Sequence, residues 1–378
     1  MSIHDCLMEQ VRPYEMEQAE KETYLLKEFR HLLQWHVQHC KPYRHLVEAQ
    51  ARDGQYAALT DLPFLPTSIF KEFELKTAAN KDVKMKTVQS SSTSSGVPSQ
   101  VFIDERTSAR QRQSLQAIWN DHIGVERRPY IIFDTMQTAR GKQVMSARGA
   151  AIMSLMGYAS EFHFVMDDIH GELRLNPERF EQALQAAREA GQFIAYGFTY
   201  LLHQAHEQLM TLYEAQKGFD SQTFLIHSGG WKRLEHMRVH KETFNQQISQ
   251  FWGIEPSQVI DFYGLVEQTG VVYPDCSAGN KHVPYFADVI IRAPHTLKPL
   301  PVGETGLIQL ISLLPLSSPN FSVLTDDLGE WVGTDECPCG RKGKAFRFKG
   351  RAPKAEARGC GDVYAEEIMG ADTKLHAK

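Results

Sequence analysis

Three features that mark whole classes of protein are missing from this sequence of 378 residues. No apolar run approaches the roughly 18 residues that suggest a membrane-spanning helix. The start, MSIHDCLMEQ, is polar and acidic and lacks the charged and then apolar order of a secretory signal. The formal net charge of -5 gives no basic excess of the kind that nucleic-acid-binding proteins carry. We therefore expect a cytoplasmic protein with no membrane span and no nucleic-acid partner.

Cysteine is also scarce. The six thiols belong to Cys6, Cys40, Cys276, Cys337, Cys339 and Cys360. They are too few and too unevenly spaced for a disulfide scaffold in a chain of this length, so metal ligation or thiol chemistry is the better expectation. The hydrophobic fraction of 42% is typical of soluble globular proteins, and the length allows one large or two medium domains.

Hydrophobic patterning divides the chain into four parts. Residues 1–80 predict a helical N-terminal segment. Residues 81–272 alternate short apolar runs with helical patterns, which predicts an α/β nucleotide-binding core with a mostly parallel, helix-covered sheet. Residues 273–350 carry apolar runs separated by proline and glycine, which predicts a β-rich subdomain. Residues 351–378 form a short C-terminal segment that carries Cys360.

The segment that follows Asn176 carries several independent signals for a helix. Asn176 and Pro177 are typical of an N-cap and a first helical position. The apolar residues after them recur at helical spacing and form one face, with Phe180, Ala183, Leu184 and Ala187.

Two glycine-containing segments follow predicted strand ends, where α/β folds bind their ligands. The segment SSSTSSG offers hydroxyls, and its Gly96 lets the backbone approach an anion, so it is either a phosphate-binding loop or a solvated turn. The segment IHSGG ends in Ser228, Gly229 and Gly230. These glycines either let a flat ligand lie against the backbone or merely form a turn.

Two further segments place carboxylates at strand ends. DFYGLVEQTG contains Tyr263, Gly264 and Glu267. A carboxylate there can hold Mg²⁺ against phosphate oxygens, or it can be a surface group that caps a helix. VLTDDLG contains Asp327, which can bind ribose hydroxyls or belong to an ordinary turn.

Taken in order, these four segments resemble the conserved motifs of the adenylate-forming superfamily, which includes the acyl-CoA synthetases. The resemblance implies that ATP and Mg²⁺ are bound and that Thr93 and Glu267 have catalytic roles. It assigns ATP phosphates to Thr93, Ser94, Ser95 and Gly96, adenine and Mg²⁺ to Ser228, Gly229, Gly230, Tyr263, Gly264 and Glu267, and ribose to Asp327. The sequence departs from the family pattern at Asp326, where glycine is usual.

Within that superfamily the chain is more similar to the acyl-protein synthetases of the fatty acid reductase complex of luminous bacteria. The segments that carry this resemblance are LPTSIFKEFELK, TSSGVPSQ, SGGWKRLE, DFYGLVEQTG and VYPDCSAGNKHVPYFADVIIRAP. It implies that a long-chain fatty acid is activated as acyl-AMP, is placed on a cysteine of the enzyme and is passed to an acyl-protein reductase. An acyl transferase is a further expected partner.

The C-terminal segment departs from the superfamily. FKGRAPK, which contains Arg351, resembles the hinge before its mobile C-terminal domain, yet the 378-residue sequence ends 27 residues after Arg351. We therefore expect a truncated domain and assign no catalytic lysine. Cys360 lies between glycines near Lys354 and Arg358, and cationic neighbours favour the thiolate. Taken alone, a cysteine of this kind more often has no catalytic role than acts as a nucleophile. The family resemblance, however, implies that Cys360 accepts the acyl group.

Four other thiol and imidazole groups are candidates for a metal site. Three thiolates and one imidazole match a closed tetrahedral site for structural zinc, and the residues concerned are Cys276, His282, Cys337 and Cys339. The Cys-x-Cys spacing is tighter than usual, so zinc and reduced, unligated thiols remain equal alternatives.

In FIAYGFTYLL, the family resemblance sets Tyr196, Gly197 and Phe198 at the entrance for the acyl carboxylate, although such aromatics are more often core.

The predicted function is ATP-dependent activation of a fatty acid followed by transfer to Cys360. One alternative is a ligase that loads coenzyme A or a carrier protein with an aryl or short acyl group. The other is a non-catalytic, zinc-stabilised binding module, against which Glu267 and Asp327 argue because a binder needs no Mg²⁺ carboxylate. The acyl chain length and the oligomeric state are not predicted.

Overall fold

The chain forms two compact units. The computed structural model describes residues 12–49, 56–80, 82–89, 98–140, 146–231 and 238–352. One unit contains the chain up to Ile118, Gly264–Tyr273 and the chain from Asn280 onward, and the other contains Trp119–Tyr263 and Pro274–Gly279. Each unit combines segments that are far apart in the sequence, whereas the four parts expected from the sequence are consecutive segments. The division into those four parts therefore stays a prediction.

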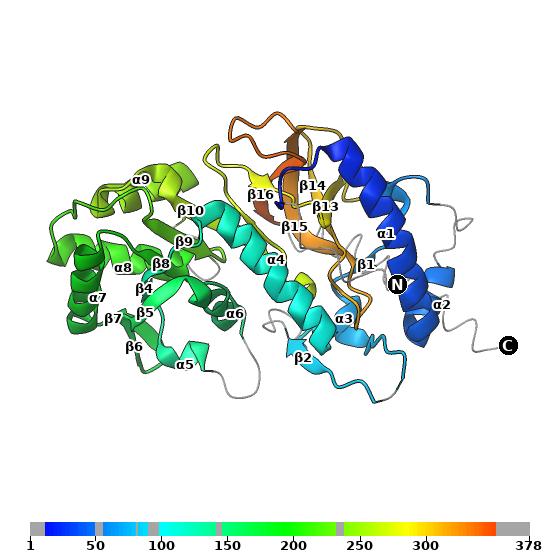
Figure 1. Cartoon of the computed structure of the whole chain (residues 1–378), viewed down its shortest axis with the longest axis horizontal. Helices are drawn as coiled ribbons and strands as arrows, with labels where there is room; N and C mark the ends of the chain where they lie inside the picture. The colour runs from blue at the N-terminus through cyan, green and yellow to red at the C-terminus, as the bar shows by residue number, and fades with distance from the viewer. Residues whose placement is uncertain are drawn as a thin grey trace. The chain divides into compact units, whose positions relative to one another are not determined.

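The first unit is built on an antiparallel sheet with the strand order β12-β16-β15-β14-β13, of which Figure 1 labels β13 to β16. The short strand β1 pairs with β15 in parallel. The strands are β1 (Leu65–Pro66), β12 (Lys281–His282), β13 (Ala287–Arg292), β14 (Thr305–Ser312), β15 (Ser322–Thr334) and β16 (Lys344–Arg351). Strands β2 (Lys86–Gln89) and β3 (Gln100–Ile103) form a separate pair. The expected β-rich part of the fold is therefore confirmed.

Helix α1 supplies much of the core of the first unit. Its residues (Gln18–His39) bury Leu25, Phe29, Leu32 and Leu33 along one stripe, the pattern of an amphipathic helix. The Phe29 ring stacks on Phe321 at 5.9 Å between centroids, and the His36 ring stacks on the same Phe321 at 5.4 Å. Phe321 directly precedes β15, so this packing fixes α1 against the strand that carries Asp327. The helices that follow are α2 (Lys41–Ala49), α3 (Ile69–Glu72) and α4 (Glu105–Ile123).

The second unit contains a parallel sheet. Its strands lie in the order β11-β10-β9-β8-β4-β5, where β11 comprises Val272–Pro274, and the neighbouring pairs from β10 to β5 are parallel. The strands are β4 (Arg128–Ile132), β5 (Ala159–Phe164), β8 (Ile194–Phe198), β9 (Phe224–Ser228) and β10 (Val259–Gly264). Its helices are α5 (Met136–Ala139), α6 (Ala147–Ser154), α7 (Pro177–Ala190), α8 (Thr199–Leu212) and α9 (Lys241–Trp252). The remaining strands, β6 (Met166–Ile169) and β7 (Glu172–Leu175), form a separate antiparallel pair.

Alternation of strands and helices along the chain produces this sheet, and the prediction of a mostly parallel α/β fold is confirmed. Helix α7 shows the local cause. The Asn176 side chain accepts a hydrogen bond from the backbone N–H of Arg179 at 3.0 Å, Pro177 occupies the first helical position, and Gly191 ends the helix in the left-handed region. The predicted apolar face of α7 is buried.

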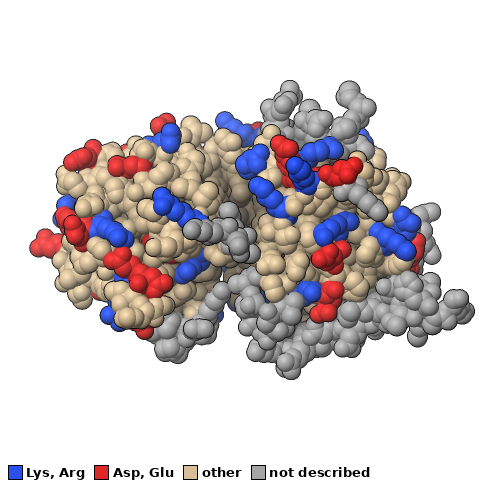
Figure 2. Space-filling model, turned by 90° about the horizontal axis from the view of Figure 1, so that it is seen from below, with Lys and Arg blue, Asp and Glu red and all other residues tan. Residues whose placement is uncertain are grey.

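No helix in the described part of the chain is long and apolar enough to cross a membrane. Acidic and basic side chains are interspersed on the face shown in Figure 2. On this face the charges of opposite sign therefore offset each other locally.

Candidate functional site

The first unit brings two of the predicted carboxylates into one electrostatic environment. Glu267 lies in a 3₁₀ turn (Val266–Gln268) after β10 and is only 4% exposed, and Asp327 lies on β15. Burial is the main cause that raises the pKa of Glu267, and the Asp327 charge raises it further. A hydrogen bond with Ser99 and the charge of Lys71 act in the opposite direction. A buried carboxylate near a second one is costly unless a cation compensates, so this arrangement is chemically suited to a cation.

The Glu267 turn is locked onto the antiparallel sheet by buried amides. Gln268 is 2% exposed, and its Nε2 donates to the carbonyl oxygens of Leu310 at 3.0 Å and Asn320 at 2.9 Å. The Asn320 side chain in turn donates to the carbonyl oxygen of Glu267. These hydrogen bonds join the turn to Leu310 of β14 and to Asn320, two residues before β15, so the turn that carries Glu267 is held by the sheet.

Helix α4 supports the same turn from another direction. Gln111 Nε2 donates to Thr269 Oγ1 at 2.9 Å, and Ser114 Oγ donates to the carbonyl oxygen of Gly270 at 2.6 Å. Gly270 has φ +98°, and a Cβ added there would meet Gln111 Cγ at 2.6 Å. Only glycine allows this close approach of the turn to the helix.

Replacing Gly270 by alanine is therefore expected to damage both stability and the site. The left-handed backbone and the clash together should cost about 3 kcal/mol of unfolding free energy. The matched control is Gly303→Ala, because Gly303 has φ +86° and an added Cβ would meet nothing within 4 Å. That variant should lose only about 1 kcal/mol. Denaturant unfolding measures both, and equal losses in the two variants would contradict the role of the Gln111 contact.

Asp327 and Arg351 are cross-strand partners in the β15–β16 ladder. Arg351 Nε lies 3.9 Å from Asp327 Oδ1, and the arginine side chain is 63% exposed. The Asp327 backbone N–H donates to Thr325 Oγ1 at 3.1 Å, and the Ala352 N–H donates to the Asp326 carbonyl oxygen at 2.9 Å. An ion pair of this length with an exposed arginine is weak, so it holds the Arg351 guanidinium only loosely.

The second unit places its predicted residues at the carboxyl edge of the parallel sheet. The register of strands β8, β9 and β10 aligns three residues, Phe198, Ser228 and Phe262. Gly229 and Tyr263 follow Ser228 and Phe262 directly, so they lie at the same edge. Tyr196 OH lies 2.9 Å from Ser228 Oγ, and burial is the main cause that raises the pKa of Tyr196.

Gly229 lies close to an aromatic ring at this edge. It has φ +76°, and a Cβ added there would lie 3.2 Å from atoms of the Phe198 ring. The structure thus brings Tyr196, Phe198, Ser228 and Gly229 together. The ligand-binding roles given to these residues, and to Gly197, Gly230, Tyr263 and Gly264, stay predictions.

Four residues that the sequence interpretation did not assign also belong to these two sites. Ser99 and Lys71 interact with Glu267 in the first unit, and both lie in segments that carried the family resemblance. In the second unit Asp134 is buried two residues after the end of β4, and Arg148 Nε lies 3.4 Å from its Oδ2. An aspartate directly after an apolar strand run was the available signal for this pair.

Some predicted residues lie outside the described residues. These are the loop residues Thr93, Ser94, Ser95 and Gly96 and the proposed acyl acceptor Cys360. The four candidate zinc ligands are all described. One ligand atom from each of Cys276, His282, Cys337 and Cys339 lies within 4.8 Å of the others.

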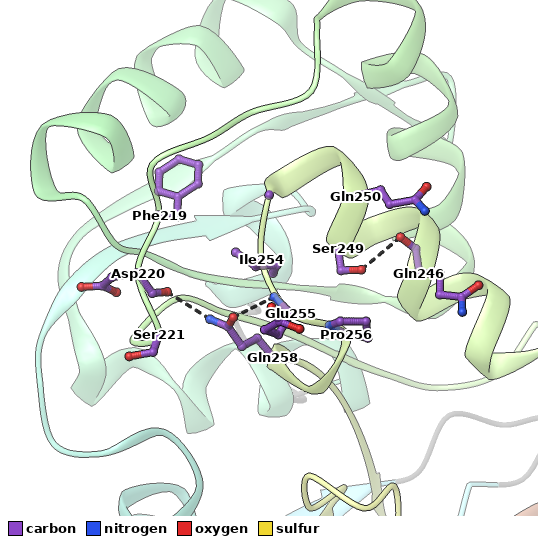
Figure 3. A pocket seen from close by; sticks show the side chains of 11 residues that line it. Phe219, Asp220, Ser221, Gln246, Ser249, Gln250, Ile254, Glu255, Pro256 and Gln258 are labelled. Carbon is purple, nitrogen blue, oxygen red and sulfur yellow. Dashed lines mark hydrogen bonds between the residues drawn. The ribbon is translucent and has the colours of Figure 1, made fainter.

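A pocket in the second unit lies away from the predicted residues. It has a volume of about 700 Å³ and is lined by segments around Phe219–Ser221, Gln246–Gln250 and Gly253–Gln258 (Figure 3). Gln258 spans it, accepting from the Glu255 N–H at 2.8 Å and donating to the Asp220 carbonyl oxygen at 3.1 Å. Because two of these segments precede β9 and β10, the pocket lies at the amino ends of strands whose carboxyl ends carry Ser228 and Gly264.

Comparison with solved structures shows a shared fold. A structure of 2-hydroxyisobutyryl-CoA ligase in an open conformation, in complex with 2-HIB-AMP and CoA, matches with a TM-score of 0.65 and 17% sequence identity, covering 90% of this chain and 77% of that one. The same ligase in its postadenylation state matches with a TM-score of 0.62 and 16% identity, covering 90% and 69%. The expected fold of adenylate-forming ligases is thereby confirmed.

Comparison of sequences identifies the family. A protein from Vibrio harveyi named long-chain-fatty-acid–luciferin-component ligase is 29% identical, covering 78% of this chain and 76% of the relative. A protein of the same name from Aliivibrio fischeri is 25% identical, covering 86% and 84%. The family described as acyl-protein synthetase, LuxE, matches residues 1–369. The chain therefore belongs to the acyl-protein synthetase family.

Proposed function

We propose that this protein uses ATP to activate a long-chain fatty acid as its acyl-adenylate and then transfers the acyl group to Cys360. The observation that carries the first step is the buried Glu267 with Asp327, Ser99 and Lys71 around it. A carboxylate pair with a hydroxyl and an ammonium group suits a metal-bound nucleotide. Membership of the acyl-protein synthetase family and the printed name of the Vibrio harveyi relative support the fatty acid as substrate.

In the first step, an oxygen of the fatty acid carboxylate attacks the α-phosphorus of ATP. The bond from that phosphorus to the bridging oxygen breaks, and pyrophosphate leaves. Mg²⁺, when bound, neutralises charge on the transferring and leaving phosphates. Glu267 would hold this ion, and Lys71 and Ser99 would add a positive charge and a hydroxyl donor beside it. Their contribution is electrostatic and positional.

The other nucleotide contacts follow from the predicted residues. Asp327 and Arg351 would bind the ribose hydroxyls, because a carboxylate accepts from both hydroxyls and a guanidinium donates to oxygen. We further propose that the serine-rich loop contacts the phosphates and that the carboxyl edge of the parallel sheet contacts adenine. The residues concerned are Thr93, Ser94, Ser95 and Gly96 for the loop, and Ser228, Gly229, Gly230, Tyr263 and Gly264 for the edge.

In the second step, the Cys360 thiolate attacks the acyl carbon of the adenylate. A carbon–sulfur bond forms, the bond to the AMP oxygen breaks, and AMP leaves with its phosphate charged. The thioester is then the donor for a partner reductase, and an acyl transferase would supply the acid. These two partners, and the role of residues 351–378 as the acyl-carrying segment, are part of the proposal.

Fatty acid-dependent ATP–pyrophosphate exchange tests the first step. The protein is incubated with ATP, Mg²⁺ and labelled pyrophosphate, together with a long-chain, a short-chain or an aryl acid, each with and without coenzyme A. Exchange that depends on the long-chain acid and forms no coenzyme A thioester supports the proposal. Preference for an aryl acid with formation of a coenzyme A thioester would replace it with the ligase alternative. No exchange with any acid would favour a non-catalytic module.

A further inference from the structure

Three candidate metal ligands gather at one end of the antiparallel sheet of the first unit. Cys337 and Cys339 lie in the connection between β15 and β16, and His282 is the last residue of β12. Cys339 Sγ lies 3.2 Å from His282 Nε2, and the thiol of Cys276, six residues before His282 in sequence, belongs to the same group. His282 pairs with Ala345 of β16 in the sheet, so the ladder sets the position of the imidazole relative to the connection.

The backbone presents these thiols on two similar turns. In Cys276–Gly279 and in Cys337–Gly340, the N–H of the fourth residue donates to the carbonyl oxygen of the first, at 2.8 and 2.9 Å. Both turns end on a glycine in the left-handed region, with φ +72° at Gly279 and +84° at Gly340. Each turn therefore begins with a cysteine, and these two independent turns put thiols into one group whose ligand atoms span at most 4.8 Å.

The spacing and the chemistry of the group fit a tetrahedral metal. Zinc–sulfur bonds of about 2.3 Å place neighbouring sulfur atoms about 3.8 Å apart, and a nitrogen ligand comes slightly closer. The ligand atoms already lie within that order of distance. His282 is 0% exposed, so its imidazole lies in the interior beside the three thiols.

The surroundings balance the charge of such a site. Three thiolates with Zn²⁺ leave one net negative charge. The cations Arg341 and Lys21 both interact with His282, and Asn280 Nδ2 donates to Cys337 Sγ at 3.6 Å. Donors to ligand sulfur and nearby positive charge are the usual outer support of a zinc site.

We propose that Cys276, His282, Cys337 and Cys339 bind one Zn²⁺ in a closed site that is structural. Four protein ligands leave no open position, so the ion has no place for a water or a substrate. The site is independent of the proposed adenylation chemistry, and either proposal stands if the other fails.

The metal would hold a connection to which the N-terminal part of the chain is attached. Asp335 begins this connection, and both of its carboxylate oxygens accept from the Gln18 N–H, at 3.2 and 3.1 Å. The Lys342 N–H donates to the Tyr14 carbonyl oxygen at 2.9 Å, and the Tyr14 ring lies edge-on to His282 at 6.1 Å. Loss of the metal should therefore loosen residues 335–343 and the start of α1 together.

Metal analysis of the full-length protein is the direct test. Purified protein, dialysed extensively against metal-free buffer containing a reductant, should retain about one zinc per chain. Cys339→Ser should lose most of it. Cys40→Ser is the matched control, because Cys40 is also a buried cysteine of the first unit but is not among the four ligands, and it should keep its zinc. Wild-type protein without zinc, or with zinc that survives in Cys339→Ser, would overturn the proposal.

A second measurement does not depend on any variant. Cobalt exchanged into the wild-type protein should give the visible bands of a tetrahedral ion and a near-ultraviolet thiolate charge-transfer band. Removal of the metal with a strong chelator should speed amide hydrogen exchange in residues 12–18 and 335–343, while α7 of the second unit stays protected. Octahedral cobalt spectra, or unchanged exchange after the metal has left, would contradict a structural site made by these four side chains.

Discussion

Replacing Cys360 by serine should abolish acylation of the protein while it leaves fatty acid-dependent ATP–pyrophosphate exchange within about twofold of the wild-type rate. Exchange reports only the formation and reversal of the adenylate, in which the thiol takes no part. Acylation needs a nucleophile that is charged at neutral pH, and a serine hydroxyl without an adjacent base is far weaker than a thiolate. The two steps should therefore separate in this one variant.

The measurement uses a radiolabelled long-chain fatty acid with ATP and Mg²⁺, followed by a denaturing gel with and without hydroxylamine, which cleaves thioesters. Wild-type protein should carry a hydroxylamine-sensitive label, and Cys360→Ser should carry none. Cys40→Ser is the control, because Cys40 is 1% exposed within the core of the first unit. A label that persists in Cys360→Ser and disappears in another cysteine variant would move the acceptor to that cysteine.

Replacing Glu267 by glutamine should slow both pyrophosphate exchange and acylation. This result would differ from that of Cys360→Ser, in which only acylation should be lost. Glutamine keeps the size of the side chain and its capacity to hydrogen-bond with Ser99, but it removes the charge that would hold Mg²⁺. Loss of a preorganised electrostatic group from a site of this kind typically lowers turnover by about 10²- to 10³-fold. We expect a fall of that size in pyrophosphate exchange, and a matching fall in the rate of acylation.

Glu330→Gln is the matched control for that experiment. Glu330 lies on β15, the strand that also carries Asp327, and its partner is Lys349 at 2.7 Å. Losing such a pair near the surface costs about 0 to 1 kcal/mol, so this variant should exchange pyrophosphate as the wild type does. Unfolding curves would show whether Glu267→Gln keeps its fold. A folded Glu267→Gln protein with normal exchange would contradict the role proposed for Glu267.

Local signals made most of the fold predictable. The start of α7 at Asn176-Pro177 and its buried face depend on neighbours a few residues apart, and so does the alternation that gives the parallel sheet. The short strand β1 was not visible in this way. Its two residues, Leu65 and Pro66, lie within the part of the chain that the patterning predicts to be helical, and they become a strand by pairing with Val323 and Leu324 of β15.

Some residues of the candidate site could likewise be predicted from local sequence, and others could not. Glu267 and Asp327 could be chosen from the sequence because each has a recognisable flanking pattern. Ser99 and Lys71 could not be given a role beside Glu267, because their interaction with it depends on how distant segments pack. The four zinc candidates could be chosen as residue types. The paired turns that present Cys276 and Cys337 could not be predicted, because they depend on the folded backbone.

The hydrogen bond from the Ala352 N–H to the Asp326 carbonyl oxygen also sets the length of a tether. It attaches the end of the described chain beside Asp327, so Cys360 follows its anchor by eight residues. Whatever path those residues take, eight peptide units reach at most about 28 Å. A thiol confined to that radius would meet the proposed adenylate at an effective concentration that short tethers commonly raise to about the millimolar range. Lengthening the segment between Ala352 and Cys360 should therefore slow acylation without changing the formation of the adenylate.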